Sequence, residues 1–161
     1  MRTTLVDYTT LTPAQLEQLD LIQVDAAQKE FSSDIAGGLA VLHAHQGNDV
    51  KGFVLLDEAL PVAFLLLKRP PASPAWATGT TCTLHALQVD KDQQGRGLGR
   101  RCMEALPAVA RAAWPETTHL MLAVDAGNHA ARGLYLKQGF IDSGETFYGR
   151  VGEERRLTLA L

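Results

Sequence analysis

The 161-residue sequence has only two cysteines, Cys82 and Cys102. They form no Cys-x-x-Cys pair and have no histidines at the spacing of zinc ligands, so the sequence does not predict a zinc site. We expect two reduced, mostly buried thiols. His43 and His45 are two residues apart, which would place them on different faces of a helix, so we expect no metal there either.

Long apolar runs and an excess of charge are also missing. No run approaches the ~20 apolar residues of a membrane-spanning helix, and the first residues do not resemble a signal peptide, so we expect a cytoplasmic protein with no membrane partner. A net charge of −3 gives no broad basic field, so we expect no nucleic-acid partner. Hydrophobic residues at 46% and charged residues at 20% are typical of a globular protein, and the length predicts a single domain over residues 1–161.

Glycine, in contrast, is concentrated in the run Gly95-Arg96-Gly97-Leu98-Gly99. An apolar strand and the turn of residues 90–94 precede this run, and a helix is expected to follow it. Glycine loses more chain entropy on folding than any other residue, so three glycines in five residues indicate that something must approach the backbone. Bare N–H groups at the start of a helix hold phosphate or pyrophosphate well. We therefore predict an anion-binding turn, with local positive charge from Arg96, Arg100 and Arg101.

Two familiar phosphate loops do not fit this turn. A dinucleotide fingerprint needs a small residue where Arg100 stands, and a Walker loop needs a Gly-Lys-Ser/Thr sequence that is absent. The pattern Gln94-x-x-Gly97-x-Gly99 after a strand instead resembles the pyrophosphate loop of the acetyl-CoA-dependent N-acetyltransferases of the GNAT superfamily.

A second motif, Asn128-x-x-Ala131-x-x-Leu134-Tyr135-x-x-x-Gly139-Phe140, supports this resemblance. Asn128 and Tyr135 are seven residues apart, about two helical turns, so a helix would place both on one face. Gly139 suits the left-handed residue that ends a helix. The segment resembles the second conserved block of the same superfamily, in which the asparagine contacts the pantetheine arm and the tyrosine hydroxyl faces the sulfur.

The order of the expected elements predicts an α/β fold. Strands are expected over residues 3–7, 53–56, 62–67, 81–89, 119–124, 140–148 and 155–159, and helices over residues 12–29, 34–45, 97–113 and 128–138. The GNAT resemblance implies a mixed central sheet of about six to seven strands flanked by about four helices, mostly antiparallel before the glycine-rich turn and parallel after it. Residues 120–124 are all apolar, which is typical of a strand buried on both faces.

The resemblance implies an enzyme that transfers an acetyl group from acetyl-CoA, its co-substrate, to a primary amine of a small molecule or peptide by direct attack. It implies that the backbones of Leu87 and Val89 hold the pantetheine arm and the acetyl carbonyl. It also implies that Tyr135 is the general acid for the departing sulfur, with a packing residue in the core as the alternative. The implied coenzyme-binding residues are Leu87, Val89, Gln94, Gly95, Arg96, Gly97, Gly99, Arg100, Asn128 and Tyr135.

His85 is the candidate general base. A strand period of two would place His85, Leu87 and Val89 on one face, and an imidazole of pKa about 6.5 can accept an amine proton directly or through water. The strand and loop also resemble those of arylalkylamine N-acetyltransferases, which use histidines on this strand, but Thr83 stands where a second histidine is expected. A packed core histidine is the alternative. Other candidates for attracting or deprotonating the amine are Glu30, Asp57 and Glu58.

Two other classes of function stay open at this point. A non-catalytic acyl-CoA-binding regulatory module would predict loss of the tyrosine, which is present as Tyr135. A nucleotide-binding switch or structural protein fits badly, because the other phosphate-loop patterns fail. The sequence leaves open the acceptor, which could be a small amine, an amino acid, a peptide, an antibiotic or a protein lysine. It also leaves open whether the protein is a homodimer.

Overall fold

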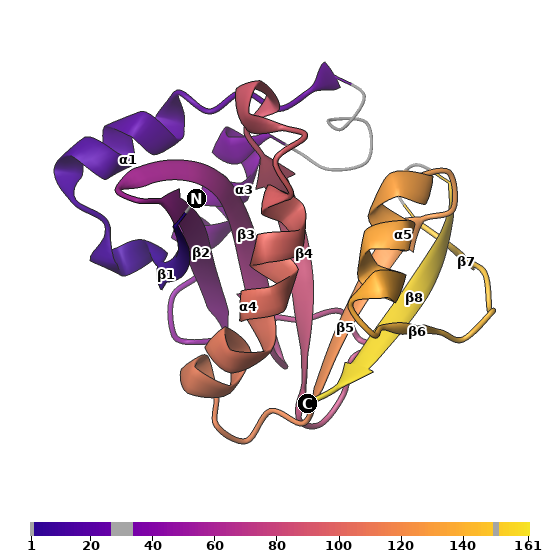
Figure 1. The fold of residues 1–161 in the computed structure, drawn as a ribbon. Coiled ribbons are helices and arrows are strands. Elements are labelled where there is room, and N and C mark those ends of the chain that lie inside the picture. The colour runs from indigo at the N-terminus through magenta and orange to yellow at the C-terminus, as the bar shows by residue number, and fades with distance from the viewer. Residues whose placement is uncertain (1, 27–33, 150–151) are drawn as a thin grey trace.

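The computed structural model describes residues 2–26, 34–149 and 152–161, and Figure 1 shows their arrangement. The strands are β1 (Thr3–Asp7), β2 (Val50–Asp57), β3 (Leu60–Lys68), β4 (Thr81–Val89), β5 (His119–Asp125), β6 (Ile141–Asp142), β7 (Phe147–Tyr148) and β8 (Glu153–Ala160). The α-helices are α1 (Pro13–Asp20), α3 (Ile35–Ala44), α4 (Leu98–Ala113) and α5 (His129–Lys137), and short 3₁₀ turns are η1 (Tyr8–Thr10) and η2 (Lys91–Gln93). Within these ranges, no helix combines the length and apolarity needed to cross a membrane.

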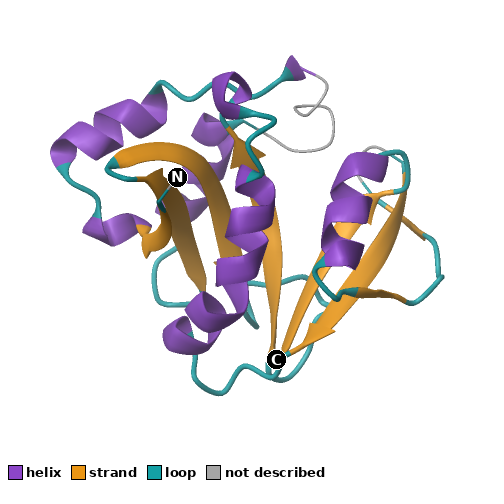
Figure 2. Ribbon diagram, in the orientation of Figure 1, coloured by secondary structure: helices purple, strands orange, loops and turns teal. Residues whose placement is uncertain are grey.

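The strands form one mixed sheet in the order β1-β2-β3-β4-β5-β8-β6, with β7 paired to β8, and helices lie against it (Figure 2). The predicted α/β class is therefore confirmed. The described part of the sheet has eight strands, one more than the seven expected segments, because residues 140–148 form two short strands, β6 and β7.

The expected parallel arrangement after the glycine-rich turn was wrong. Among the described strands, only β4 and β5 pair in parallel, and β8 runs antiparallel to β5, β6 and β7. A parallel pair needs a long crossover connection, which α4 provides between β4 and β5. After the crossover through α5, β6 runs in the same direction as β5. The two strands are not neighbours, because β8 lies between them and is antiparallel to both.

The first helix begins as expected and ends early. Thr12 Oγ1 accepts a hydrogen bond from Gln15 N, and Gln15 Oε1 accepts one from Thr12 N, which forms a capping box. Helix α1 ends at Asp20, so the helix predicted to continue to residue 29 was wrong; residues 27–29 lie outside the described ranges. Ile22 and Val24 reach the core from an extended loop instead, and this loop is held by the hydrogen bond from Lys91 N to the Gln23 carbonyl.

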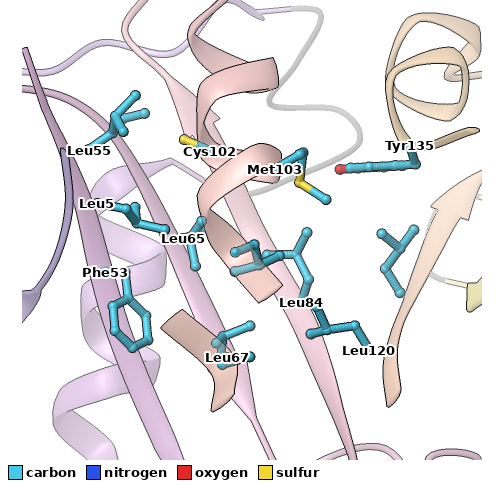
Figure 3. Close-up of a cluster of buried hydrophobic side chains, with 14 of the residues drawn as sticks. Leu5, Phe53, Leu55, Leu65, Leu67, Leu84, Cys102, Met103, Leu120 and Tyr135 are labelled. Carbon is cyan, nitrogen blue, oxygen red and sulfur yellow. The ribbon is translucent and has the colours of Figure 1, made fainter. Parts of the chain in front are cut away.

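Two hydrophobic clusters lie on opposite faces of the sheet. Helix α4 covers the first cluster, shown in Figure 3, and contributes Leu98, Cys102, Met103, Leu106 and Ala110. Helices α1 and α3 cover the second cluster, which is built on β2 and β3. Cys82 and Cys102 are free and buried in the first cluster, as the sequence predicted.

Strand β5 is buried on one face only. Leu120, Leu122 and Val124 are buried in the first cluster, whereas Met121 is half-buried and Ala123 is exposed. The expectation that residues 120–124 are covered on both faces was therefore wrong. Among the described helices on this side of the sheet, α1 and α3 lie against β2 and β3 and not against β5.

Candidate active site

Strands β4 and β5 pair over three residues and then separate. The pairs are Thr81–His119, Cys82–Leu120 and Thr83–Met121. Strand β4 continues to Val89 and β5 to Asp125, and Figure 1 shows the two strands diverging toward their C-terminal ends. Beyond the last pair, the two strand edges face each other without a ladder. This opening offers peptide groups to a narrow, extended ligand.

A bulge in β4 lies beside the opening. Ala86 has φ +55, and the register between β3 and β4 shifts between Phe64 and Leu66. His85 pairs with Leu66 and Gln88 pairs with Phe64, so one extra residue is accommodated in β4. Such a bulge interrupts the alternation of side chains along a strand.

The bulge overturns the prediction that His85 shares a face with Leu87 and Val89. Residues directly opposite in an antiparallel pair project to the same face, and His85 lies opposite Leu66, which belongs to the cluster under α1 and α3. Leu87 and Val89 pack against the cluster under α4. His85 and the two apolar side chains therefore lie on opposite faces of the sheet.

His85 is half-buried and contacts Thr83, the residue found where a second histidine was expected. The Thr83 Oγ1 atom lies 2.6 Å from His85 Nε2. Burial, and then the positive charge of Lys68, lowers the pKa of His85 to about 4. The imidazole is therefore neutral at neutral pH. The sequence led us to expect an imidazole of ordinary pKa, and the pKa of His85 is lower than that. A neutral ring can still accept a hydrogen bond.

Tyr135 is buried on α5, with 8% of its surface exposed. Its ring lies 6.0 Å from that of Phe140, and Figure 3 shows the hydroxyl pointing toward Met103 on α4. Burial, and then the neighbouring Cys102 thiol, raises the pKa of Tyr135 to about 12. The phenol therefore keeps its proton and can donate a hydrogen bond between the two helices that flank the opening.

Asn128 begins the helix that carries Tyr135. Its Oδ1 accepts a hydrogen bond from Ala131 N at 3.3 Å, so Asn128 caps this helix. Gly139 has φ +95 just after the helix, which confirms its predicted left-handed conformation. Two turns of helix thus separate Asn128 from Tyr135, as the spacing predicted.

The glycine-rich turn connects β4 to α4 and is exposed. Gly97 has φ +74 at the N-cap of α4, and Gly95 has φ +83. A Cβ built on either residue would meet no atom within 4 Å, so packing does not require these glycines. Gly99 differs, because its Cβ would lie 3.2 Å from Leu134 Cδ2 of α5. The turn therefore presents open backbone at the start of a sixteen-residue helix.

The two arginines of the turn have acidic partners. Arg96 turns toward β2, where its Nη2 lies 2.5 Å from Asp57 Oδ2, and it also donates to Gln93. Arg100 is exposed and its Nε lies 2.7 Å from Glu104 Oε1. Arg96 therefore anchors the turn to the β2–β3 hairpin, and Asp57 belongs to that anchor.

Two candidates for attracting the amine remain, Glu58 and Glu30. Glu58 is exposed in the β2–β3 turn with φ +59. Glu30 lies outside the described residues. Among the described residues, no three histidine, cysteine or acidic side chains are arranged to hold a metal ion.

A cleft of about 620 Å³ lies between the beginning of α4 and helix α5. It is lined by Arg100, His129, Ala130, Gly133, Leu134, Lys137 and Gln138. The volume is in the range of small-molecule sites, and two of the lining side chains are permanently cationic. The sequence reasoning missed His129 and Lys137. Their spacing could have indicated them, because residues 129, 133 and 137 follow each other at intervals of four and share one helix face.

The model of the acetyltransferase (GNAT) family matches residues 16–140 of the chain. The uncharacterized N-acetyltransferase YbbJ of Bacillus subtilis is 31% identical over 103 residues, which cover 63% of this chain and 64% of that protein. The L-methionine sulfoximine/L-methionine sulfone acetyltransferase of Pseudomonas aeruginosa is 40% identical over 62 residues, 38% of this chain and 34% of that protein. The matched segments thus cover less than two thirds of the length of either relative.

The same fold occurs in the aminoglycoside acetyltransferase AAC(6')-Ib solved in complex with coenzyme A. The two structures superpose with a TM-score of 0.76 over 99% of this chain and 95% of the other, at 16% sequence identity. The resemblance predicted from the glycine-rich turn and the Asn128–Tyr135 motif is confirmed. The chain belongs to the acetyltransferase (GNAT) family.

Proposed function

We propose that this protein is an N-acetyltransferase that transfers the acetyl group of acetyl-CoA to a primary amine of a small molecule or peptide by direct attack. The observation that carries the proposal is the separation of β4 and β5 directly after Thr83–Met121, with the Tyr135 hydroxyl directed across the space between α5 and α4. Membership of the GNAT family supports the choice of co-substrate.

The coenzyme is held in three places in this proposal. The exposed backbone of residues 94–99 and the N-terminal end of α4 bind the pyrophosphate, because their N–H groups and the helix dipole favour an anion. Arg100 and Lys137 in the adjoining cleft add positive charge for the remaining phosphate. The pantetheine arm enters the opening along the backbones of Leu87 and Val89, with Asn128 on its other side.

The reaction is a direct substitution at the thioester carbonyl. The neutral amine attacks the carbonyl carbon, the C–S bond breaks, and coenzyme A leaves as a thiolate. Tyr135, whose pKa is about 12, is a weaker acid than an ordinary thiol of pKa about 8.5. It therefore stabilises the departing sulfur by donating a hydrogen bond and keeps its own proton. The proton that neutralises the thiolate comes from the nitrogen of the newly acetylated amine.

His85 acts on the acceptor side in this proposal. The coenzyme occupies the face of the sheet under α4 and α5, so the acceptor approaches from the face that carries Thr83 and His85. A histidine of pKa about 4 cannot store the proton of an alkylammonium group. Its neutral ring can accept a hydrogen bond from the amine or from a water molecule that removes the proton, which makes it a positioning group more than a strong base.

A thermal-shift measurement with and without acetyl-CoA, followed by thiol release with a panel of primary amines, tests the proposal. We expect acetyl-CoA to raise the melting temperature and at least one amine to release coenzyme A and yield an N-acetyl product. Stabilisation by acetyl-CoA with no thiol release from any amine would indicate the non-catalytic acyl-CoA-binding module instead. Absence of both effects would contradict both functions.

A further inference from the structure

The face of the sheet opposite α4 and α5 continues from β4 across β5 to β8. Thr83 pairs with Met121, and neighbouring residues of paired strands project to the same side. Ala123 follows Met121 on this side and lies opposite Arg156 of β8. Arg156 is therefore on the same face as His85, one strand beyond β5 and two residues past the point where β4 and β5 separate.

The guanidinium of Arg156 lies over two aromatic rings on this face. Its guanidinium carbon lies 3.5 Å from the centroid of the Phe147 ring and 4.8 Å from that of Trp76. Phe147 comes from β7 and Trp76 from the loop that precedes β4. Both rings and the arginine are half-buried. Contact with two rings restricts the orientation of the guanidinium and of its N–H groups.

The guanidinium of Arg156 has no carboxylate partner among the described residues. Its Nε is buried without a hydrogen-bond partner. The other half-buried arginines of the described chain are paired: Arg69 with Asp49 and Glu116, and Arg132 and Arg155 with Asp142. A partly desolvated cation without a counter-ion is unfavourable, so the arrangement favours an anion that arrives from outside.

We infer that Arg156 binds the carboxylate of the acceptor, so that the acceptor is an amine that also bears a carboxylate, such as an α-amino acid. The inference rests on the proposed N-acetyltransferase function. A guanidinium whose orientation is restricted can bind a carboxylate through two parallel hydrogen bonds. Neighbouring strands are ~4.8 Å apart, so an arginine on β8 can reach the edge of the opening beside β5. In an α-amino acid the carboxylate and the amine are attached to the same carbon, so an arginine that binds the carboxylate also positions the amine.

The test compares paired acceptors that differ only in this group: L-amino acids and their carboxamides. The wild-type protein should acetylate the amino acids with the higher kcat/KM. Arg156→Gln should lower kcat/KM for the amino acids by about 10- to 100-fold, mainly through KM, because a charge-assisted hydrogen bond is lost. The same variant should leave kcat/KM for the carboxamides unchanged. Arg111→Gln, at an exposed arginine of α4, is the matched control and should behave as wild type for both series.

A second variant separates recognition from folding. Trp76→Leu removes one of the two rings and keeps the charge of Arg156. It should therefore lower kcat/KM for the amino acids by a smaller factor than Arg156→Gln does, and leave kcat/KM for the carboxamides unchanged. Equal losses for both series in Arg156→Gln, or a wild-type preference for the carboxamides, would overturn the inference and leave the proposed function intact. No transfer to any amine would overturn the proposed function and the inference with it.

Discussion

Thr83 of β4 and Met121 of β5 form the last pair that joins these two strands. Beyond this pair, β4 continues to pair with β3, and β5 continues to pair with β8. The features assigned to the site lie around the resulting opening: Tyr135 on α5 and the glycine-rich turn at the end of β4. The position of one residue pair thus sets where the opening between the two strands begins.

Gly97→Val should abolish measurable acetyl-CoA binding, which means a dissociation constant at least about 100-fold higher, or roughly 2.7 kcal/mol. A Cβ at φ +74 strains the backbone and occupies the open space where the pyrophosphate would lie. Isothermal titration calorimetry measures the change.

Gly79→Val is the matched control for this prediction. Gly79 has φ +64 and equally open surroundings, but it precedes β4 at the other end of the strand. Both variants should lose similar stability, about 1–3 kcal/mol of backbone strain. Unchanged acetyl-CoA affinity in a folded Gly97→Val protein would contradict the phosphate-binding role of the turn.

Tyr135→Phe should lower kcat by about 10²- to 10³-fold, the loss of one hydrogen-bond donor to the departing sulfur, and leave the affinity for acetyl-CoA nearly unchanged. The phenylalanine keeps the packing against Phe140 and removes only the hydroxyl that is proposed to face the sulfur. Tyr8→Phe, at a tyrosine that contacts His43 instead, should have wild-type turnover. Wild-type turnover in Tyr135→Phe, with the chemical step rate-limiting, would reduce Tyr135 to a packing residue.

Lys137→Gln should lower the affinity for acetyl-CoA about fivefold, or roughly 1 kcal/mol for an exposed charge, and should leave the affinity for acetyl-pantetheine unchanged. Lys137 lines the cleft beside Arg100, and acetyl-pantetheine lacks the phosphates that this cleft is proposed to bind. Competition binding at two salt concentrations measures both ligands, because added salt should reduce the difference between wild type and variant. An equal loss for both ligands would show that Lys137 does not act through the phosphates.

The stability of the protein should fall as the pH is lowered from about 6.5 to about 4, and His85→Gln should remove part of this dependence. The folded protein holds His85 neutral to a pKa of about 4, whereas the unfolded chain protonates it near 6.5. The unfolded state therefore binds more protons in this window, and the free energy of unfolding falls with decreasing pH. The contribution is at most about 3 kcal/mol.

Urea unfolding at several pH values measures this effect. His129→Gln, at an exposed histidine of α5, should retain the wild-type slope. A parallel offset of His85→Gln at every pH, with no change in slope, would show that His85 is not held neutral.

The local signals in the sequence predicted much of the backbone conformation around the candidate site. Gly97 and Gly139 occupy left-handed positions for which glycine is favoured, and Asn128 caps the helix that places Tyr135. These features depend on a few neighbouring residues and on backbone conformation, which the residue types determine directly.

Features set by non-local contacts could not be predicted in the same way. The bulge at Ala86 depends on the register with β3, and it moved His85 to the other face of the sheet. The contact of Arg156 with two rings joins β8, β7 and a loop about eighty residues earlier in the chain. Periodicity within one strand contains no information on either contact.

The most direct test of the account is a crystal structure of the protein with coenzyme A. We expect the pantetheine arm between β4 and β5 beyond Thr83–Met121, the pyrophosphate against the backbone of residues 94–99, and the sulfur within about 4 Å of the Tyr135 hydroxyl, the reach of a hydrogen bond to sulfur. A coenzyme bound outside this opening, or a sulfur that points away from Tyr135, would contradict the central claim that the separation of these two strands forms the acetyl-transfer site.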